Sequence, residues 1–178
     1  MRHVFVRFGA VVAFVLTSYV ATKAEAPVQA AKPSAETTRE VVGDWVVACS
    51  PPKTGHKTCV MTQTLASKKL KKPVSVLLIG KDRTGKLKGS LRMPVGVSLQ
   101  EGVVIRIEHQ DPFTVPFAAC HRIGCFAPFD LNEPLVVKLK TATNITVVAH
   151  SVSQQALRFS FSTRGFSNAY ETYLAQAK

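Results

Sequence analysis

Residues 44–65 read DWVVACSPPKTGHKTCVMTQTL, two apolar runs rich in β-branched residues on either side of a segment of proline, glycine and lysine. Runs of this length, with apolar side chains favouring every second position, are typical of β-strands that bury one face. The intervening residues 50–57 have the composition of a turn. The stretch therefore predicts a β-hairpin with Trp45 in the core and with Cys49 and Cys59 on opposite strands.

The same pattern continues along the chain. We expect further strands at 74–79, 87–91, 103–107, 135–139, 145–149 and 157–161, with a polar hairpin loop at 80–85 between the first two. Eight or so short strands separated by turn signals predict an all-β fold, either a β-sandwich or a related barrel. One C-terminal helix is predicted after Gly165, where apolar residues recur at helical spacing: Phe166, Ala169, Tyr170, Tyr173 and Leu174.

The N-terminus has the pattern of a secretory signal. Arg2 and Arg7 precede an uncharged apolar run at 8–20, and small residues follow, so cleavage is expected after Ala24, with Ala26 and Ala30 as alternatives. We assign 1–24 to the signal peptide. Residues 25–40 are polar and rich in alanine and proline, which predicts a disordered arm, and 41–178 then form a single β-rich domain. The expected location is the periplasm, the cell envelope or the exterior.

Four cysteines in an exported chain are expected to be oxidised. They allow three pairings, of which we favour Cys49–Cys59 and Cys120–Cys125, because each would close a local turn. The spacings differ from the Cys-x-x-Cys pattern of thiol oxidoreductases. A metal site at Cys120, His121 and Cys125 would lack the paired ligand spacing of zinc modules. We therefore predict two structural disulfides, and neither a metal nor another cofactor.

Several short motifs occur in one order along the domain. They are Gly43-Asp44-Trp45 leading to Cys49, Cys59 with Gln63 four residues on, LRMPVGVSL at 91–99, Cys120 followed by Gly124-Cys125, and Gly165-Phe166 with Ala169. Together these motifs resemble the invasion-associated locus B family. The resemblance implies an exported bacterial protein of the periplasm or envelope with a disulfide-bearing, mostly β fold. Members in some intracellular pathogens are linked to virulence through entry into host cells, notably red blood cells, and the family supplies no catalytic residues to transfer.

The basic residues are unevenly distributed. The chain has 23 basic and 11 acidic residues, a formal net charge of +12. We interpret the segment 68–92, whose basic residues are opposed only by Asp82, as the candidate anion-binding surface. The lysines at 68–72 depart from the family's pattern. The expected partners of this surface are lipopolysaccharide phosphates, anionic phospholipid of a membrane with which the protein associates peripherally, or sialylated host glycans. The alternative is a solvated face without a ligand. The candidates are Lys68, Lys69, Lys71, Lys72, Lys81, Arg83, Lys86, Lys88 and Arg92.

Aromatic side chains gather elsewhere. No Phe, Tyr or Trp lies between Trp45 and Phe113, so the basic segment lacks the stacking residues of single-strand nucleic-acid binders, and no nucleic acid is expected. Four phenylalanines lie close together after this gap, and they either fill the core or form an exposed rim that contacts another envelope protein. They are Phe113, Phe117, Phe126 and Phe129.

Catalytic motifs are missing from the sequence. It has no Gly-x-Ser-x-Gly, no His-Glu-x-x-His and no glycine-rich phosphate loop. No recognisable dyad joins His109 to Asp111, and Glu108 and Asp130 could pair with a histidine only through tertiary contacts. We therefore predict a non-enzymatic envelope protein that binds anionic envelope or host-surface groups. The alternative hypothesis is a periplasmic scaffold or chaperone-like protein that binds other envelope proteins.

Overall fold

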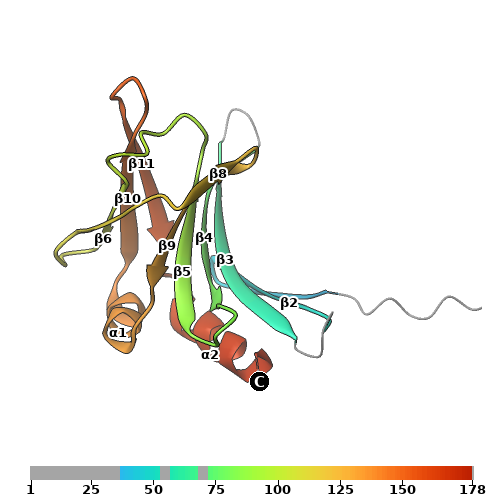
Figure 1. Ribbon diagram of the computed structural model, residues 1–178. Coiled ribbons are helices and arrows are strands. Elements are labelled where there is room, and N and C mark those ends of the chain that lie inside the picture. The colour runs from blue at the N-terminus through green and yellow to red at the C-terminus, as the bar shows by residue number, and fades with distance from the viewer. Residues whose placement is uncertain (1–36, 53–56, 68–71, 178) are drawn as a thin grey trace, which may run out of the picture. The chain divides into compact units, whose positions relative to one another are not determined.

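The computed structural model describes residues 37–52, 57–67 and 72–177 (Figure 1). The expected signal peptide lies outside the described residues, as does most of the arm. The described part of the chain forms eleven strands and two helices. They are β1 (Thr38–Val42), β2 (Trp45–Ser50), β3 (Thr58–Ala66), β4 (Pro73–Lys81), β5 (Leu87–Met93), β6 (Val103–Ile107), β7 (Phe113–Val115), β8 (Ala119–His121), β9 (Gly124–Asp130), α1 (Glu133–Thr141), β10 (Asn144–His150), β11 (Ala156–Ser162) and α2 (Phe166–Gln176).

The strands form two antiparallel sheets that share one core. The seven-stranded sheet has the order β1-β2-β3-β4-β5-β9-β8, and the four-stranded sheet has the order β11-β10-β6-β7. Helix α2 packs on β1, β2 and β3 and also contacts α1. Figure 1 shows both helices at the end of the sheets where the β4–β5 turn lies. The predicted β-rich fold with a C-terminal helix and two disulfides is confirmed.

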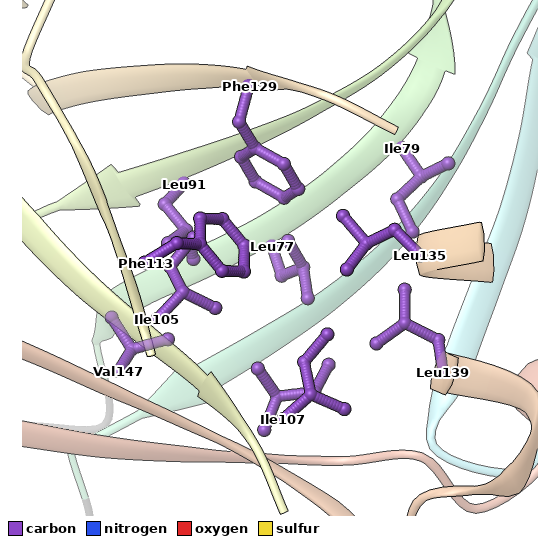
Figure 2. Close-up of a pocket in the computed structure, with 11 residues that line it drawn as sticks. Leu77, Ile79, Leu91, Ile105, Ile107, Phe113, Phe129, Leu135, Leu139 and Val147 are labelled. Atoms are coloured by element: carbon purple, nitrogen blue, oxygen red, sulfur yellow. The ribbon is translucent and has the colours of Figure 1, made fainter. Parts of the chain in front are cut away.

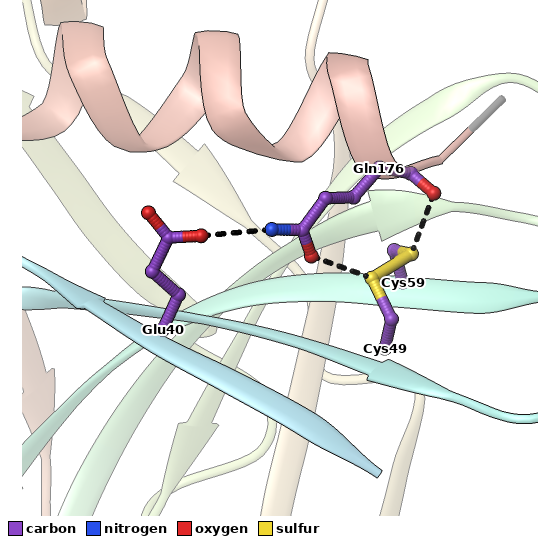
Figure 3. Close-up of a disulfide and its surroundings, with 4 residues drawn as sticks. All are labelled: Glu40, Cys49, Cys59 and Gln176. Carbon is purple, nitrogen blue, oxygen red and sulfur yellow. Dashed lines mark hydrogen bonds between the residues drawn. A yellow bond between two sulfur atoms is a disulfide. The ribbon is translucent and has the colours of Figure 1, made fainter. Parts of the chain in front are cut away.

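Strand register explains the disulfide pairing. In the β2–β3 hairpin Cys49 stands directly opposite Cys59, and in β8–β9 Cys120 stands opposite Cys125. Directly paired residues share a face of the sheet, so each pair of sulfurs is held within bonding reach by backbone pairing. The first disulfide is buried beneath the end of α2, where Gln176 lies 3.2 Å from Cys49 Sγ (Figure 3).

Two glycines bring distant turns into backbone contact. Gly43, between β1 and β2, has φ 61°, and Gly165, before α2, has φ 82°. A Cβ on Gly43 would lie 2.5 Å from the Arg164 carbonyl oxygen, so another residue would force the two turns apart. This contact places Trp45 beside Phe166, with ring centroids 5.3 Å apart in an edge-on arrangement. It gives a physical reason for the Gly-Asp-Trp and Gly-Phe motifs.

A buried glutamine joins the two sheets. Gln63 on β3 is 5% exposed; its Nε2 donates to the Ser162 carbonyl oxygen at 2.8 Å, and the Ser162 amide donates to its Oε1 at 2.7 Å. The side-chain amide thus pairs with the last residue of β11 as a backbone peptide would. These two bonds connect the seven-stranded sheet to the four-stranded one.

One predicted strand is a helix. Residues 135–139 were expected to be extended but lie in α1, with Val136 and Leu139 buried at helical spacing. Asn132 caps the helix by accepting from the Leu135 amide at 3.1 Å, and Pro134 stands in the first turn. A short apolar run cannot by itself separate strand from helix, so the capping residues were the missed signal.

Strand pairing also corrects the start of the domain. β1 begins at Thr38, so residues 38–40, expected in the disordered arm, are ordered by pairing with β2. The sequence also gave no sign of β7, β8 and β9. These strands are short or contain proline and glycine, and β9 pairs with β5, which lies far away in the sequence.

Candidate functional site

The β4–β5 hairpin divides the predicted basic surface into two parts. Lys68, Lys69 and Lys71 lie outside the described residues. Register places Gly80 opposite Lys88 but Val76 opposite Arg92, so the described cations lie toward opposite ends of the hairpin. At about 3.3 Å per residue the nine steps from position 72 to position 81 extend over roughly 30 Å. The six described candidates therefore form two separate groups and no continuous anion site. Lys72 and Arg92 lie at one end of the hairpin, and the other end carries Lys81, Arg83, Lys86 and Lys88.

The β4–β5 turn carries its own carboxylate. Asp82 Oδ1 accepts from the Thr84 hydroxyl at 2.7 Å, the Thr84 amide at 2.8 Å and the Lys86 amide at 3.1 Å. These hydrogen bonds, above all the one from the Thr84 hydroxyl, hold the pKa of Asp82 below its ordinary value. The carboxylate therefore remains negative at neutral pH, between the lysines that flank the turn.

A second acid reduces the charge of this group further. Lys88 on β5 forms an ion pair with Asp130 on the neighbouring strand β9. The hydrogen bond from the ammonium group lowers the pKa of Asp130, and the same bond raises the pKa of Lys88. Two of the four cationic charges at this turn are thus accompanied by carboxylates.

The opposite end of the two sheets is formed by three loops, which we call the loop end. It comprises the 94–102 loop, the β8–β9 turn at 121–124 and the β10–β11 turn at 151–155 (Figure 1). The Ser98 amide donates to the His150 carbonyl oxygen at 2.7 Å, and the Val152 amide donates to the Gly96 carbonyl oxygen at 2.9 Å. Backbone hydrogen bonds therefore hold the first and third loops together.

Three cations surround the loop end. Lys72 is exposed just before β4, Arg122 is exposed in the β8–β9 turn, and Arg92 is half-buried on β5. The Arg92 side chain passes over Gly124, since a Cβ on that glycine would lie 2.9 Å from Arg92 Cγ. Among the described residues none of the three cations forms an ion pair. Their charge is therefore available to an external anion.

The one acid of the loop end is already engaged. Glu101 Oε2 lies 2.7 Å from His150 Nδ1. Hydrogen bonds from Gln154 and Ser98, with a smaller contribution from His150, hold the pKa of Glu101 below its ordinary value. Glu101 thus ties the 94–102 loop to the β10–β11 turn.

Aliphatic side chains are also exposed at the loop end. We did not single out this group from the sequence, because its members are far apart along the chain. The available signal was the aliphatic content of PVGVSL at 94–99, which is unusual for a loop that contains proline and glycine. The exposed fractions are 62% for Val95, 53% for Leu99, 64% for Ile123 and 75% for Val152.

The phenylalanine cluster lies mainly inside the protein. Phe113, Phe117 and Phe129 pack against the core, which confirms the core interpretation, whereas Phe126 is half-buried on β9. Phe113 and Phe129 meet edge to face, with centroids 6.1 Å apart (Figure 2). They help to line an apolar cleft whose cavity volume is about 10 Å³, room for one water molecule at most. The cleft is a packed core and is too small for a ligand.

The two carboxylates considered for catalysis have other hydrogen-bond partners. Glu108 accepts hydrogen bonds from the Thr143 amide and hydroxyl, while Asp130 pairs with Lys88. In the described part of the chain, the hydrogen bonds and ion pairs of these two carboxylates go to Thr143 and Lys88, and none goes to His109. Within residues 37–52, 57–67 and 72–177, no group of three or more His, Cys, Asp or Glu side chains could hold a metal ion.

Comparison with known proteins identifies the family. The sequence profile described as Invasion associated locus B (IalB) protein matches residues 45–173. The chain belongs to this family. Invasion protein B homologs from Brucella abortus strain 2308 and from B. abortus biovar 1 strain 9-941 are each 32% identical over 145 residues, which span 81% of this chain and 83% of the relative.

A solved IalB structure supports the fold. The crystal structure of invasion associated protein B from Bartonella henselae matches with a TM-score of 0.70 at 20% identity, over 78% of this chain and 95% of the other. The IalB profile starts at the core residue Trp45 and ends at the core residue Tyr173. Both disulfides and the loop end lie within it. Among the described residues, no helix is long and apolar enough to cross a membrane.

Proposed function

We propose that this IalB protein is an exported, non-enzymatic protein of the bacterial envelope that binds anionic surface groups through the cations of the loop end. Family membership supports the envelope and invasion context, since the relatives are named invasion protein B homologs and invasion associated protein B. The anionic groups in that setting are phospholipid or lipopolysaccharide phosphates and sialylated glycans. The scaffold alternative relied on an exposed phenylalanine rim, and the inward packing of Phe113 and Phe129 removes its main support.

The difference in charge compensation between the two ends carries the proposal. At the β4–β5 turn, Asp82 and Asp130 accompany the cations. At the loop end, Glu101 bonds to His150, Gln154 and Ser98, and none of Lys72, Arg92 and Arg122 forms an ion pair among the described residues. A cation without a paired carboxylate attracts an external anion more strongly than a cation that is already in an ion pair.

Removing the loop-end cations tests the proposal. The triple variant Lys72→Ser, Arg92→Ser, Arg122→Ser takes three charges from this surface. Each basic residue near an anionic membrane contributes about 1 kcal/mol, so we expect roughly 100-fold weaker retention on vesicles with anionic phospholipid. Parallel measurements on lipopolysaccharide and on sialylated glycan beads distinguish the source of the anion. Retention should fall with added salt, because exposed charges are screened.

A matched variant controls for net charge. Replacing Lys81, Arg83 and Lys86 by serine also removes three charges, but from the β4–β5 turn, and leaves Lys72 and Arg92 in place. We expect this variant to retain most of its binding on whichever anionic surface the unmodified protein prefers. Equal loss in the two variants, or no loss in the first, would contradict the assignment to the loop end.

A further inference from the structure

Exposed aliphatic residues concentrate at the loop end. Among the described residues six large hydrophobic side chains are exposed, and four of these belong to the loop end, while Val41 lies on β1 and Val137 on α1. Single exposed hydrophobic residues are ordinary, but a group at one place marks an interaction surface. The four are Val95, Leu99, Ile123 and Val152.

The supporting structure holds these side chains in place. Val95, Leu99 and Val152 line one shallow surface depression, together with the Cys120–Cys125 disulfide. The hydrogen bonds between the 94–102 loop and the β10–β11 turn fix the backbone on two sides, and the disulfide closes the β8–β9 turn that carries Ile123. A surface that is already ordered loses little conformational entropy when it binds.

The composition of the loop end fits a lipid bilayer. A soluble polyanion would contact the cations but would leave the aliphatic side chains in water. A protein interface typically contains aromatic anchors, and residues 94–102, 121–124 and 151–155 contain no Phe, Tyr or Trp. At a membrane surface, aliphatic side chains enter the acyl region while Lys and Arg reach the phosphates.

We propose that the loop end is a shallow membrane-insertion surface for anionic phospholipid bilayers. Val95, Leu99 and Val152 enter the boundary between headgroups and acyl chains, and Arg92 and Arg122 bind the lipid phosphates. This inference rests on the proposed function, because it names anionic phospholipid as the anionic surface.

Serine substitution at two aliphatic positions tests insertion without changing charge. Leu99→Ser with Val152→Ser removes side chains that are 53% and 75% exposed, and Val137→Ser with Val41→Ser removes side chains that are 52% and 74% exposed elsewhere. Because an exposed side chain gives up no packing, both variants should fold. On anionic phospholipid vesicles we expect a loss of roughly tenfold in affinity for each loop-end side chain and almost none for the control pair.

A fluorescent reporter measures depth directly. The chain has one tryptophan, Trp45, which is fully buried and gives a constant background. In a Leu99→Trp variant, vesicles should shift the emission to the blue, and lipids brominated along the acyl chain should quench it. The matched Val137→Trp variant should show neither change.

The outcomes separate this inference from the proposed function. Vesicle binding that survives Leu99→Ser with Val152→Ser, or a reporter that brominated lipid does not quench, overturns insertion and leaves anion binding intact. If the unmodified protein is retained on lipopolysaccharide or glycan but not on phospholipid vesicles, membrane insertion is likewise overturned and anion binding stands. Absence of salt-sensitive retention on all three surfaces overturns the proposed function as well.

Discussion

The bonds of Gln63 across the sheets lead to a quantitative prediction. Replacing Gln63 by methionine keeps the length and most of the volume of the side chain but removes both hydrogen bonds to Ser162. The side chain is 5% exposed, so water has little access to replace them. The variant leaves the Ser162 amide and carbonyl without these partners at the point where the two sheets meet.

The expected cost follows from those two groups. Each buried hydrogen bond contributes about 0.5–1.5 kcal/mol net, and a polar group left unpaired costs about 1–3 kcal/mol. Partial relaxation at Ser162, which is half-buried, reduces the total. We therefore expect the free energy of unfolding to fall by about 2–4 kcal/mol, a large share of the roughly 5–15 kcal/mol that stabilises a typical domain.

Equilibrium urea unfolding measures this change. Thr64→Met, at the adjacent exposed position of β3, is the matched control and should alter the free energy of unfolding by less than about 0.5 kcal/mol. Gln63→Glu keeps the acceptor for the Ser162 amide but loses the donor, so it should also be strongly destabilising. If Gln63→Met unfolds at the same urea concentration as the unmodified protein, the connection between the sheets does not stabilise the fold.

Two further predictions concern covalent and ionic contacts. Replacing both Cys49 and Cys59 by serine opens a loop of sequence separation 10 and should lower the free energy of unfolding by about 2.7 kcal/mol on the loop-entropy relation; unchanged urea unfolding would contradict it. The hydrogen bond from Arg164 holds the pKa of Asp44 below its ordinary value of 3.8, so this pair stabilises the fold above about pH 4 and loses its effect as the pH falls below that. Arg164→Gln should raise the pKa of Asp44 in a carbon-13 NMR titration, and an unchanged pKa would show that the pair does not form in solution.

Local patterns in the sequence were sufficient for much of the fold. The alternation in 44–65 correctly predicted the β2–β3 hairpin, because the burial of a strand with one face in the core repeats every two residues. The spacing after Gly165 predicted α2 in the same way. The prediction for 135–139 failed because a five-residue run with four apolar side chains fits either element, and the cap at Asn132 favours the helix.

The candidate site was harder to predict. The sequence placed nine basic residues in one segment, and proximity along the chain suggested proximity in space. An extended hairpin separates its residues by about 3.3 Å at each step, so Lys72 and Lys81 lie far apart. Asp130, which neutralises Lys88, comes from a strand that the sequence did not predict.

The sequence by itself determined most of the central strands, the C-terminal helix and the family, because each depends on spacing or on motifs along the chain. Tertiary structure alone decided that Leu99, Ile123 and Val152 share one end of the protein. Their proximity depends on β9 pairing with β5 and β10 pairing with β6, which aligns three turns that are distant in sequence. Strand order is set by the packing of the whole core, so it cannot be predicted from the side chains in the turns.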